Sequence, residues 1–346
     1  MDQLSQEHQA NMILVEEWID DITNYQQLSP KTRRTYINDV KNAARIFGEH
    51  GTSFTELRKE DLKHYLATIK EETNRPDGLS HGRLKGVFSA INSMMEFLIY
   101  EEKTFQNPIP SFRKRYMKTY KNNTTASNRR QVPSTEELGL MIAGIRDHQH
   151  KALHVLLAKT GMRRGEVHLL DIDSIDLVEG SVAVSRTGKR TPTKLPIDKE
   201  CCDVLHSYLA RLHQFPRVKG EPSLFTNRNG TRASENTLYE WVVRDATRAG
   251  LHEEGADRLD MHKKFTPHHY RHWLTTTLRA NGCPERVIRY IRGDSHHNIA
   301  DRYDHLGWNE IVVEYIQTIS SLTPRQGRRD EEYSKGKIPP GDSEWI

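Results

Sequence analysis

The stretch Thr266-Pro267-His268-His269-Tyr270-Arg271-His272 groups side chains that are able to bind and act on a phosphate. A threonine followed by proline commonly begins a helix, because the hydroxyl can cap the first backbone donors and proline fits the first turn. Helical spacing then places His268 and Arg271 one turn apart on one face. Arginine offers a planar fork of donors to phosphate oxygens, and histidine can move a proton near neutral pH. The stretch predicts a phosphate-binding helix, although such a pair taken alone is more often structural.

A second arginine lies beside a predicted turn. Thr160-Gly161 breaks one helical pattern, and Arg163-Arg164-Gly165-Glu166 begins the next. An arginine at such a turn can point at an anion, which makes Arg163 the second candidate for phosphate binding. We expect Glu166 to support Arg163 by pairing with it or by closing the helix turn.

A β-hairpin is predicted between the segment that bears Arg163 and the helix that bears Arg271. Residues 182–184 and 195–197 alternate between apolar and polar side chains, as two paired strands do. Residues 187–190, Thr-Gly-Lys-Arg, form the turn between them. Lys189 is therefore expected on a loop that can approach a ligand.

Charge points to nucleic acid only through its clustering. The 346 residues suggest two domains, and 51 Lys and Arg against 47 Asp and Glu leave a net charge of +4. Residues 103–135 contain no acidic side chain, and Tyr116 and Tyr120 interleave their basic ones. This segment predicts DNA contact. After Lys103, its basic residues are Arg113, Lys114, Arg115, Lys118, Lys121, Arg129 and Arg130.

The N-terminal part, residues 1–110, is predicted to be a helical bundle. Ser29, followed by Pro30, and Ser80 are each predicted to begin a helix. Apolar stripes at helical spacing recur over 36–47, 62–69 and 84–98, and each is typical of a core face. The function of this domain must then lie on its basic outer face, where Arg33 and Arg34 are the candidate DNA contacts.

Prolines and polar residues separate this bundle from a second domain. Asn107-Pro108-Ile109-Pro110 is predicted to end the third helix, and residues 111–133 are expected to form an extended basic linker. A capping box at Ser134 and Glu137 begins a second domain over 134–324. Its later helices are predicted over 202–212, 238–249, 284–292 and 311–319, and the polar tail 325–346 is expected to be disordered.

The cysteines and the apolar runs place limits on location. Cys201, Cys202 and Cys283 cannot form a disulfide framework or a cysteine-based zinc cluster, which fits a reducing compartment. The sequence has no apolar run of membrane-spanning length and no signal-peptide pattern at its start. We expect a cytoplasmic protein that makes no contact with a membrane.

Taken together, the motif around Arg163, the hairpin lysine, His268-x-x-Arg271 and Arg302-Tyr303-Asp304-His305 resemble the tyrosine recombinases, the phage-integrase family. The order and spacing match over most of the chain. The resemblance implies a mainly α fold with a small β-hairpin in the catalytic domain, an α+β arrangement. It also implies that the helical N-terminal bundle is a core-binding domain that contacts DNA.

The resemblance assigns a role to each motif. Arg163 and Arg271 would stabilise the negative charge on the phosphate without a metal or another cofactor. Tyr303 would attack phosphorus to form a 3′-phosphotyrosine, and His268 would accept its proton. Lys189, with Lys194 as the alternative, would protonate the leaving 5′-oxygen.

Gly293-Asp294 departs from the family pattern, which usually has Gly-His or Gly-Trp at this point. Aspartate is a poor proton donor at neutral pH, so a helper role for Asp294 in catalysis differs from that of the usual residue. Some archaeal-type members are similar at this position, so the resemblance extends to an archaeal-type or viral integrase. His296 and His297 are the nearby alternatives.

The resemblance also implies a partner and an assembly, and it leaves rival functions open. Double-stranded DNA is the implied partner, with a homotetramer on paired sites. The resemblance implies that the helix over 311–319 docks on a neighbouring protomer, and docking on its own domain is the alternative. The alternatives are a DNA-binding regulator that has lost catalysis, a type IB topoisomerase-like activity, and a metal hydrolase using His268 and His272 at i, i+4. The metal hydrolase is disfavoured because the stretch contains no His-Glu-x-x-His pattern.

Overall fold

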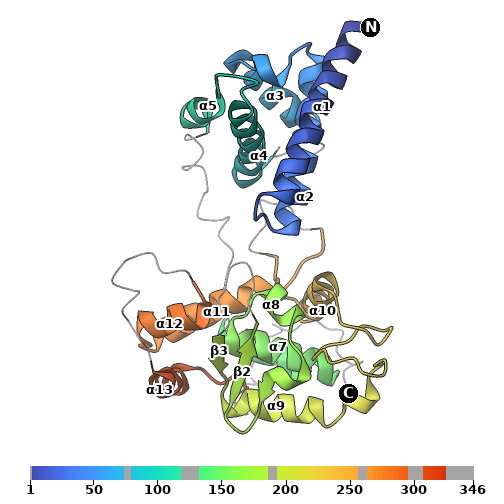
Figure 1. Cartoon of the computed structure of the whole chain (residues 1–346). Coiled ribbons are helices and arrows are strands. Elements are labelled where there is room, and N and C mark those ends of the chain that lie inside the picture. The colour runs from blue at the N-terminus through green and yellow to red at the C-terminus, as the bar shows by residue number, and fades with distance from the viewer. Residues whose placement is uncertain are drawn as a thin grey trace. The chain divides into compact units, whose positions relative to one another are not determined.

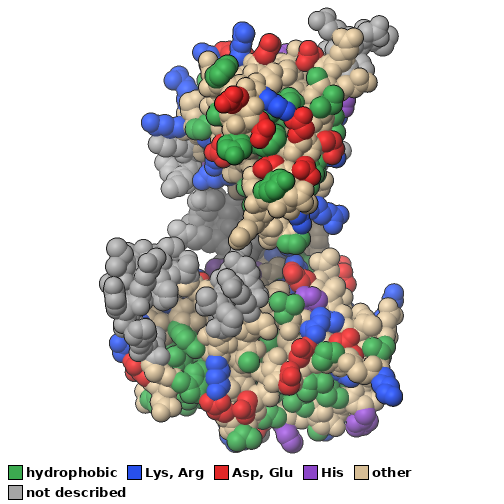
Figure 2. Space-filling model, in the orientation of Figure 1, with side chains coloured by type: hydrophobic (Ala, Val, Ile, Leu, Met, Phe, Trp, Pro, Cys, Tyr) green, Lys and Arg blue, Asp and Glu red, His purple; other side chains and the backbone are tan. Residues whose placement is uncertain are grey.

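The computed structural model describes residues 2–73, 79–117, 132–185, 193–255, 263–294 and 307–324. The chain divides into two compact units, Met1–Thr125 and Ala126–Ile346, and each is described by itself (Figure 1). On the face shown in Figure 2, Lys and Arg side chains alternate with Asp and Glu side chains over both units. This mixture agrees with the near balance of charge in the sequence.

The described part of unit 1 is helical. Ser29 caps α2, where its side chain accepts a hydrogen bond from Thr32 N and Pro30 occupies the first turn. Ser80 caps α4 in the same way, so both predicted helix starts are confirmed. The long first helix was not predicted individually. The helices are α1 (Asp2–Asn24), α2 (Pro30–Glu49), α3 (Lys59–Glu71), α4 (His81–Tyr100) and α5 (Ile109–Tyr116), with a 3-10 turn at Phe54–Glu56.

Aromatic side chains fill the core of unit 1. The Phe47 and Tyr65 ring centroids lie 5.2 Å apart, and those of Phe88 and Phe112 lie 5.3 Å apart. Trp18 of α1 is fully buried in the same core. The apolar stripes of the sequence therefore point inward, as expected, and leave the polar faces of the helices at the surface.

The expected linker over 111–133 is corrected at its beginning. Pro108 stands at the N-cap of α5 and Pro110 lies in its first turn, where a missing backbone N–H costs no helical hydrogen bond. The prediction that these prolines end the third helix is wrong, because α4 already ends at Tyr100 and the prolines begin α5 instead. Phe112 is buried in the core of unit 1, so α5 belongs to this unit. Residues 118–131 lie outside the described part of the chain.

Unit 2 combines helices with a small antiparallel sheet. The sheet has the order β1-β2-β3, and Val182 of β2 is paired with Leu195 of β3. This confirms the predicted strand pair, and the short β1 was not anticipated. The strands are β1 (Ile175–Asp176), β2 (Ser181–Val184) and β3 (Thr193–Pro196). The helices are α6 (Thr135–Gly144), α7 (His148–Thr160), α8 (Arg164–His168), α9 (Lys199–Leu209), α10 (Glu235–Arg248), α11 (Pro267–Ala280), α12 (Glu285–Arg292) and α13 (Trp308–Thr318), with 3-10 turns at Ile172–Ser174 and Leu212–Gln214.

Helix α7 is the centre of unit 2. Nearly all of its side chains are buried, and it packs between α9 and α11 (Figure 1). Gly161 ends it with a left-handed backbone, φ 59° and ψ 22°, which favours glycine. A Cβ at Gly161 would also lie 2.8 Å from Leu274 Cδ2 of α11. This glycine therefore turns the chain into α8 while α11 stays close.

The predicted fold class is confirmed: the protein is mainly helical, with a small antiparallel sheet in its second unit. Among the described residues, no helix combines the length and the apolar character that crossing a bilayer requires.

Candidate active site

The N-terminus of α8 fixes Arg163. Its backbone N donates to Glu166 Oε2 at 2.8 Å, and its Nη1 donates to Glu166 Oε1 at 2.9 Å. Glu166 is itself 2% exposed. One buried carboxylate thus closes the helix turn and orients the arginine, and both roles expected of Glu166 are confirmed.

Arg271 is held from α11 by backbone oxygens of two other segments. Its Nη1 donates to Gly161 O at 3.1 Å, and its Nη2 donates to Arg292 O at 2.7 Å. The residue is 4% exposed. These bonds join α11 to the turn before α8 and to the end of α12, so the guanidinium has a fixed place in the unit.

Asp294 brings the two arginines together. Its Oδ1 accepts from Arg271 Nη2 at 2.7 Å and from Arg163 Nη2 at 3.5 Å. Its Oδ2 lies 2.6 Å from Arg292 Nε. Gly293, with a left-handed φ of 58°, ends α12 and turns Asp294 toward the group. We call Arg163, Arg271, Arg292 and Asp294 the arginine cluster.

The arginine cluster has the chemistry of an anion-binding site. Its three guanidinium groups contact the carboxylate of Asp294, and forked donors of this kind bind carboxylate and phosphate alike. The side chains of Arg163 and Asp294 are 30% and 27% exposed, whereas that of Arg271 is 5% exposed. The cluster is therefore open to solvent on the side of Arg163 and Asp294.

The predicted helix at Thr266 is confirmed, with one addition. Thr266 is the N-cap of α11, and its backbone N donates to His269 Nδ1 at 3.0 Å. His269 is 1% exposed, so this histidine completes the cap. The sequence suggested a cap by the threonine alone, because histidine is not a usual capping residue.

His268 lies at the surface of the first turn of α11, whereas Arg271 one turn later is buried. The ring centroids of His268 and His272 are 4.5 Å apart, with the rings nearly perpendicular. The structure therefore places Arg271 inside the arginine cluster and His268 on the exposed part of the same helix. The role of His268 as a base stays a prediction.

The remaining predicted catalytic residues divide into two groups. Lys189 and Tyr303 lie outside the described residues, so their roles also stay predictions. Lys194, the alternative acid, is in β3, where its Nζ pairs with Glu179 and lies 4.8 Å from the Trp308 ring centroid. These two contacts hold Lys194 at the junction of β3 and α13.

The predicted DNA contacts of unit 1 are partly described. Arg34 is exposed on α2, and Arg33 Nη1 donates to Thr23 O at 3.2 Å. Lys114 and Arg115 are exposed on α5, next to the half-buried Arg113. Lys118 and Lys121 lie outside the described residues. The guanidinium of Arg115 is 5.9 Å from the Tyr116 ring centroid, so basic and aromatic groups adjoin here as expected.

A buried polar network supports α11 and was not predicted. His150 Nδ1 and His154 Nε2 of α7 lie 2.7 Å and 3.2 Å from Asp245 Oδ2 of α10. The other ring nitrogen of His154 forms a hydrogen bond with the hydroxyl of Tyr270, the neighbour of Arg271. The histidines are four residues apart on one helix, but sequence spacing could not show which acidic residue they meet.

Burial and hydrogen bonding set the ionisation of this network. Burial opposes ionisation of Asp245, but the hydrogen bonds with His150 and His154 outweigh it and hold the pKa of Asp245 below its ordinary value. Burial lowers the pKa of His154 despite the nearby carboxylate, and burial raises the pKa of Tyr270. The network is thus a fixed support of α11 at neutral pH.

The C-terminal segment docks on unit 2 itself. Lys159 is fully buried, and its Nζ lies 2.5 Å from Asp198 Oδ2, 2.5 Å from Glu200 Oε2 and 2.9 Å from Ser320 O. Tyr315 OH of α13 donates to Lys159 O at 2.9 Å. The chain therefore buries α13 against the core of its own unit, whereas docking on the same domain and docking on a neighbouring protomer were both open from the sequence.

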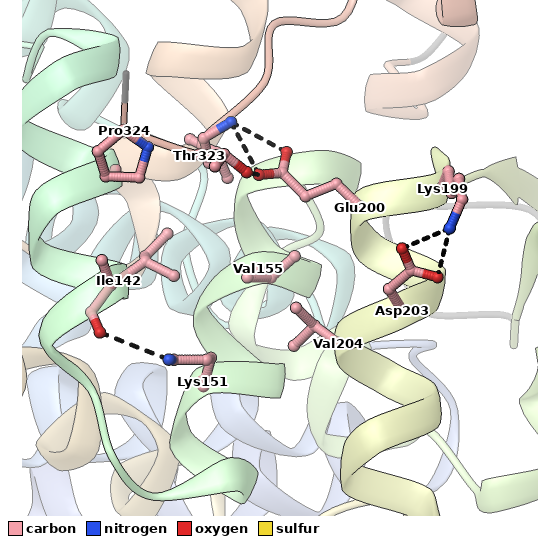
Figure 3. Close-up of a pocket in the computed structure, with 12 residues that line it drawn as sticks. Ile142, Lys151, Val155, Lys199, Glu200, Asp203, Val204, Thr323 and Pro324 are labelled. Atoms are coloured by element: carbon pink, nitrogen blue, oxygen red, sulfur yellow. Dashed lines mark hydrogen bonds and ion pairs between the residues drawn. The ribbon is translucent and has the colours of Figure 1, made fainter. Parts of the chain in front are cut away.

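The same docking lines a pocket that is separate from the arginine cluster (Figure 3). Glu200 accepts hydrogen bonds from Leu322 N at 2.9 Å and from Thr323 Oγ1 at 2.7 Å. Gly139 of α6 faces the backbone of Leu322, where a Cβ would overlap the carbonyl oxygen. The pocket is lined by Gly139, Ile142, Ala143, Lys151, Val155, Lys199, Glu200, Asp203, Val204, Leu322, Thr323 and Pro324.

Comparison with known proteins identifies the class of this architecture. The phage integrase family matches residues 135–310, and the phage integrase N-terminal SAM-like domain matches residues 15–102. The chain belongs to the phage integrase family. The predicted resemblance is confirmed, and members of this family named tyrosine recombinase are site-specific DNA recombinases. The enzyme class expected from the motifs is confirmed with it.

Individual relatives align over nearly their whole length. Tyrosine recombinase XerC of Alcanivorax borkumensis is 23% identical over 318 residues, which cover 92% of this chain and 96% of the relative. Tyrosine recombinase XerC of Herpetosiphon aurantiacus is 25% identical over 314 residues, covering 89% and 95%.

Solved structures support the fold. The Tn1549 transposon integrase, solved in complex with a circular intermediate DNA, has a TM-score of 0.64 at 18% identity and covers 87% of this chain and 98% of that one. A lambda integrase tetramer bound to a Holliday junction has a TM-score of 0.61 at 14% identity, covering 85% and 78%.

Proposed function

We propose that this protein cleaves and rejoins double-stranded DNA at specific sites through a 3′-phosphotyrosine intermediate, with Tyr303 as the nucleophile. The observation that supports it most is the arginine cluster, in which Arg163 and Arg271 converge on one oxygen anion. Two such forks can bind the non-bridging oxygens of a phosphodiester, which gain negative charge as phosphorus is attacked. This stabilisation requires neither a metal nor ATP.

The proposed reaction is an exchange of two phosphoester bonds. The Tyr303 oxygen forms a bond to phosphorus as the bond to the 5′-oxygen breaks, and His268 accepts the tyrosine proton. Lys189, or Lys194 in its place, gives a proton to the departing 5′-oxygen. A 5′-hydroxyl from another strand then reverses these steps, so the bond energy is conserved and the strand is rejoined.

The contacts that hold the two arginines in fixed positions support this function. Glu166 orients Arg163 from within α8, and the carbonyl oxygens of Gly161 and Arg292 orient Arg271. Donors that are placed before the phosphate arrives do not have to reorganise during the reaction, which lowers the barrier. The buried network of His150, His154 and Asp245, which is hydrogen-bonded to Tyr270, helps to hold α11 in place.

Double-stranded DNA is the proposed partner, with a homotetramer on paired sites. The similar Tn1549 and lambda integrases were solved with DNA, the latter as a tetramer on a Holliday junction. The exposed Lys114 and Arg115 on α5 and Arg34 on α2 are the proposed backbone contacts of unit 1. Such a protein acts where DNA is held, and the proposed location is the cytoplasm.

A second function is favoured by one observation. Because the Asp294 carboxylate already contacts both arginines, a regulator that binds DNA without cleaving it is the alternative. The test is to incubate the full chain with a library of duplexes, recover covalent protein–DNA adducts under denaturing conditions, and sequence the attached ends. Adducts that share one junction and disappear in Tyr303→Phe support the recombinase. DNA binding without adducts supports the regulator.

A further inference from the structure

We propose that Asp294 is a built-in stand-in for the substrate phosphate, which a DNA phosphate must displace before Arg163 and Arg271 can act on it. This inference rests on the proposed function, since it gives the arginine cluster its substrate. It differs from a role for Asp294 as a proton donor, because it assigns the residue an effect on access to the site.

The first support is geometric. Asp294 Oδ1 accepts from Arg271 Nη2 at 2.7 Å, a short distance for a charge-assisted hydrogen bond, and from Arg163 Nη2 at 3.5 Å. Each of the two forks donates to this one oxygen, as each would donate to a non-bridging phosphate oxygen. A phosphate and the carboxylate cannot both occupy that position.

The second support is that the arginines are oriented without the carboxylate. Arg163 is paired with Glu166 within its own helix turn, and Arg271 donates to the carbonyl oxygens of Gly161 and Arg292. Removing the charge of Asp294 therefore leaves both guanidinium groups anchored. The carboxylate balances their charge, because like charges in a half-buried site repel one another.

The third support is the position of Asp294 in the chain. It directly follows Gly293, which ends α12 in the left-handed conformation, and its side chain is 27% exposed. Its backbone N donates to Arg289 O of α12 at 3.3 Å, and this bond does not involve the side chain, so a change of the side-chain torsions leaves α12 intact. When a stronger anion arrives, the carboxylate can thus turn toward solvent and give up its contacts with the arginines, the 2.6 Å contact with Arg292 Nε included.

The expected consequence is weaker binding of oxyanions by the natural protein than by a variant without the charge. Loss of a competing hydrogen bond to a charged group corresponds to about ten-fold or more in affinity. Asp294→Asn keeps the size of the side chain and removes its charge. This variant should bind inorganic sulfate about ten-fold more tightly than the natural protein.

The experiment is calorimetric titration of the full chain with sodium sulfate at constant ionic strength. Glu235→Gln is the matched control, because it removes a carboxylate that pairs with Arg164 at 3.2 Å, directly beside Arg163. The control should bind sulfate within two-fold of the natural protein. Adding Arg163→Ala to Asp294→Asn should abolish the gain, which shows that sulfate occupies the arginine cluster.

Equal or weaker sulfate binding by Asp294→Asn overturns the proposal. Asp294→Ser also removes the carboxylate, with a smaller side chain, and is the second variant to test if Asp294→Asn does not fold. If neither variant folds, the carboxylate is part of the structural framework and the proposal is also overturned. The outcome is independent of cleavage: absent covalent adducts refute the recombinase function, whereas unchanged sulfate affinity refutes only the stand-in role.

Discussion

Arg163 and Arg271 donate to the same atom, Asp294 Oδ1, although Arg163 is the N-cap of α8 and Arg271 lies in α11. The turn at Gly161 and the end of α12 make this possible, since both supply carbonyl oxygens that Arg271 uses. The convergence turns two separate sequence motifs into one anion site. This anion site can be tested by replacing an arginine with lysine, which keeps the positive charge but removes the planar guanidinium.

Arg271→Lys should reduce the rate of adduct formation at least 100-fold, because a point charge cannot reproduce a two-pronged clamp on the transition state. The rate is measured on a single-turnover substrate built from the mapped site. Arg279→Lys is the control on the same helix, where the residue forms an exposed pair with Glu285. The control should stay within two-fold. A loss of only a few-fold in Arg271→Lys would remove Arg271 from the clamp.

Glu166→Gln should slow adduct formation about ten-fold while DNA affinity stays nearly the same, since Glu166 acts by orienting Arg163. The two readings come from single-turnover cleavage and from equilibrium binding of the same duplex. Asp203→Asn, which breaks an exposed pair with Lys199 on α9, is the control. An equal loss of affinity and rate would show that Glu166 only stabilises the fold.

The sequence predicts the local features of the fold well. Local patterns predicted the helix starts at Ser29, Ser80, Ser134 and Thr266 and the strand pair, because caps and alternation act over a few positions. The proline-containing segment before α5 was misjudged, since the same proline can end one helix or begin another.

Long-range contacts were beyond the sequence. The bonds from Arg271 to Gly161 O and Arg292 O depend on which backbone oxygens tertiary packing brings close. The same is true of Asp294: the sequence places it where the family usually has histidine or tryptophan, but could not show that its carboxylate contacts both arginines. A motif names the residue types of a site, whereas packing decides which of them touch.

The buried network makes stability depend on pH. The folded-state pKa of His154 is lowered by burial, so its contribution is fully present above the unfolded value of about 6.5 and declines as pH falls through that value. The pKa of Asp245 is also lowered, and its contribution is lost only below about 3.9. Urea unfolding of unit 2 should therefore show lower stability at pH 5 than at pH 7.5, and His154→Gln should flatten this change. An unaltered pH slope in the variant would contradict the assignment.

The docked C-terminal segment can be tested at a glycine. Gly139→Ala places a methyl group against the Leu322 backbone and should lower the free energy of unfolding by about 1 to 3 kcal/mol, as overpacking does. It should also expose residues 320–324 to limited proteolysis. Gly144→Ala is the control in the same helix, because its Cβ would meet nothing within 4 Å. Equal behaviour of the two variants would show that the segment is not docked on α6.

In the proposed function, Tyr303 forms the covalent bond to DNA. The direct measurement is mass spectrometry of the trapped adduct after nuclease and protease digestion, which identifies the tyrosine that carries the nucleotide. Two other tyrosines of unit 2 already donate hydrogen bonds: Tyr315 OH donates to Lys159 O at 2.9 Å, and Tyr290 OH donates to Lys194 O at 3.0 Å. A 3′-linked nucleotide is expected on the peptide that contains Tyr303. A nucleotide on Tyr290 or Tyr315, with Tyr303 unmodified, would contradict it.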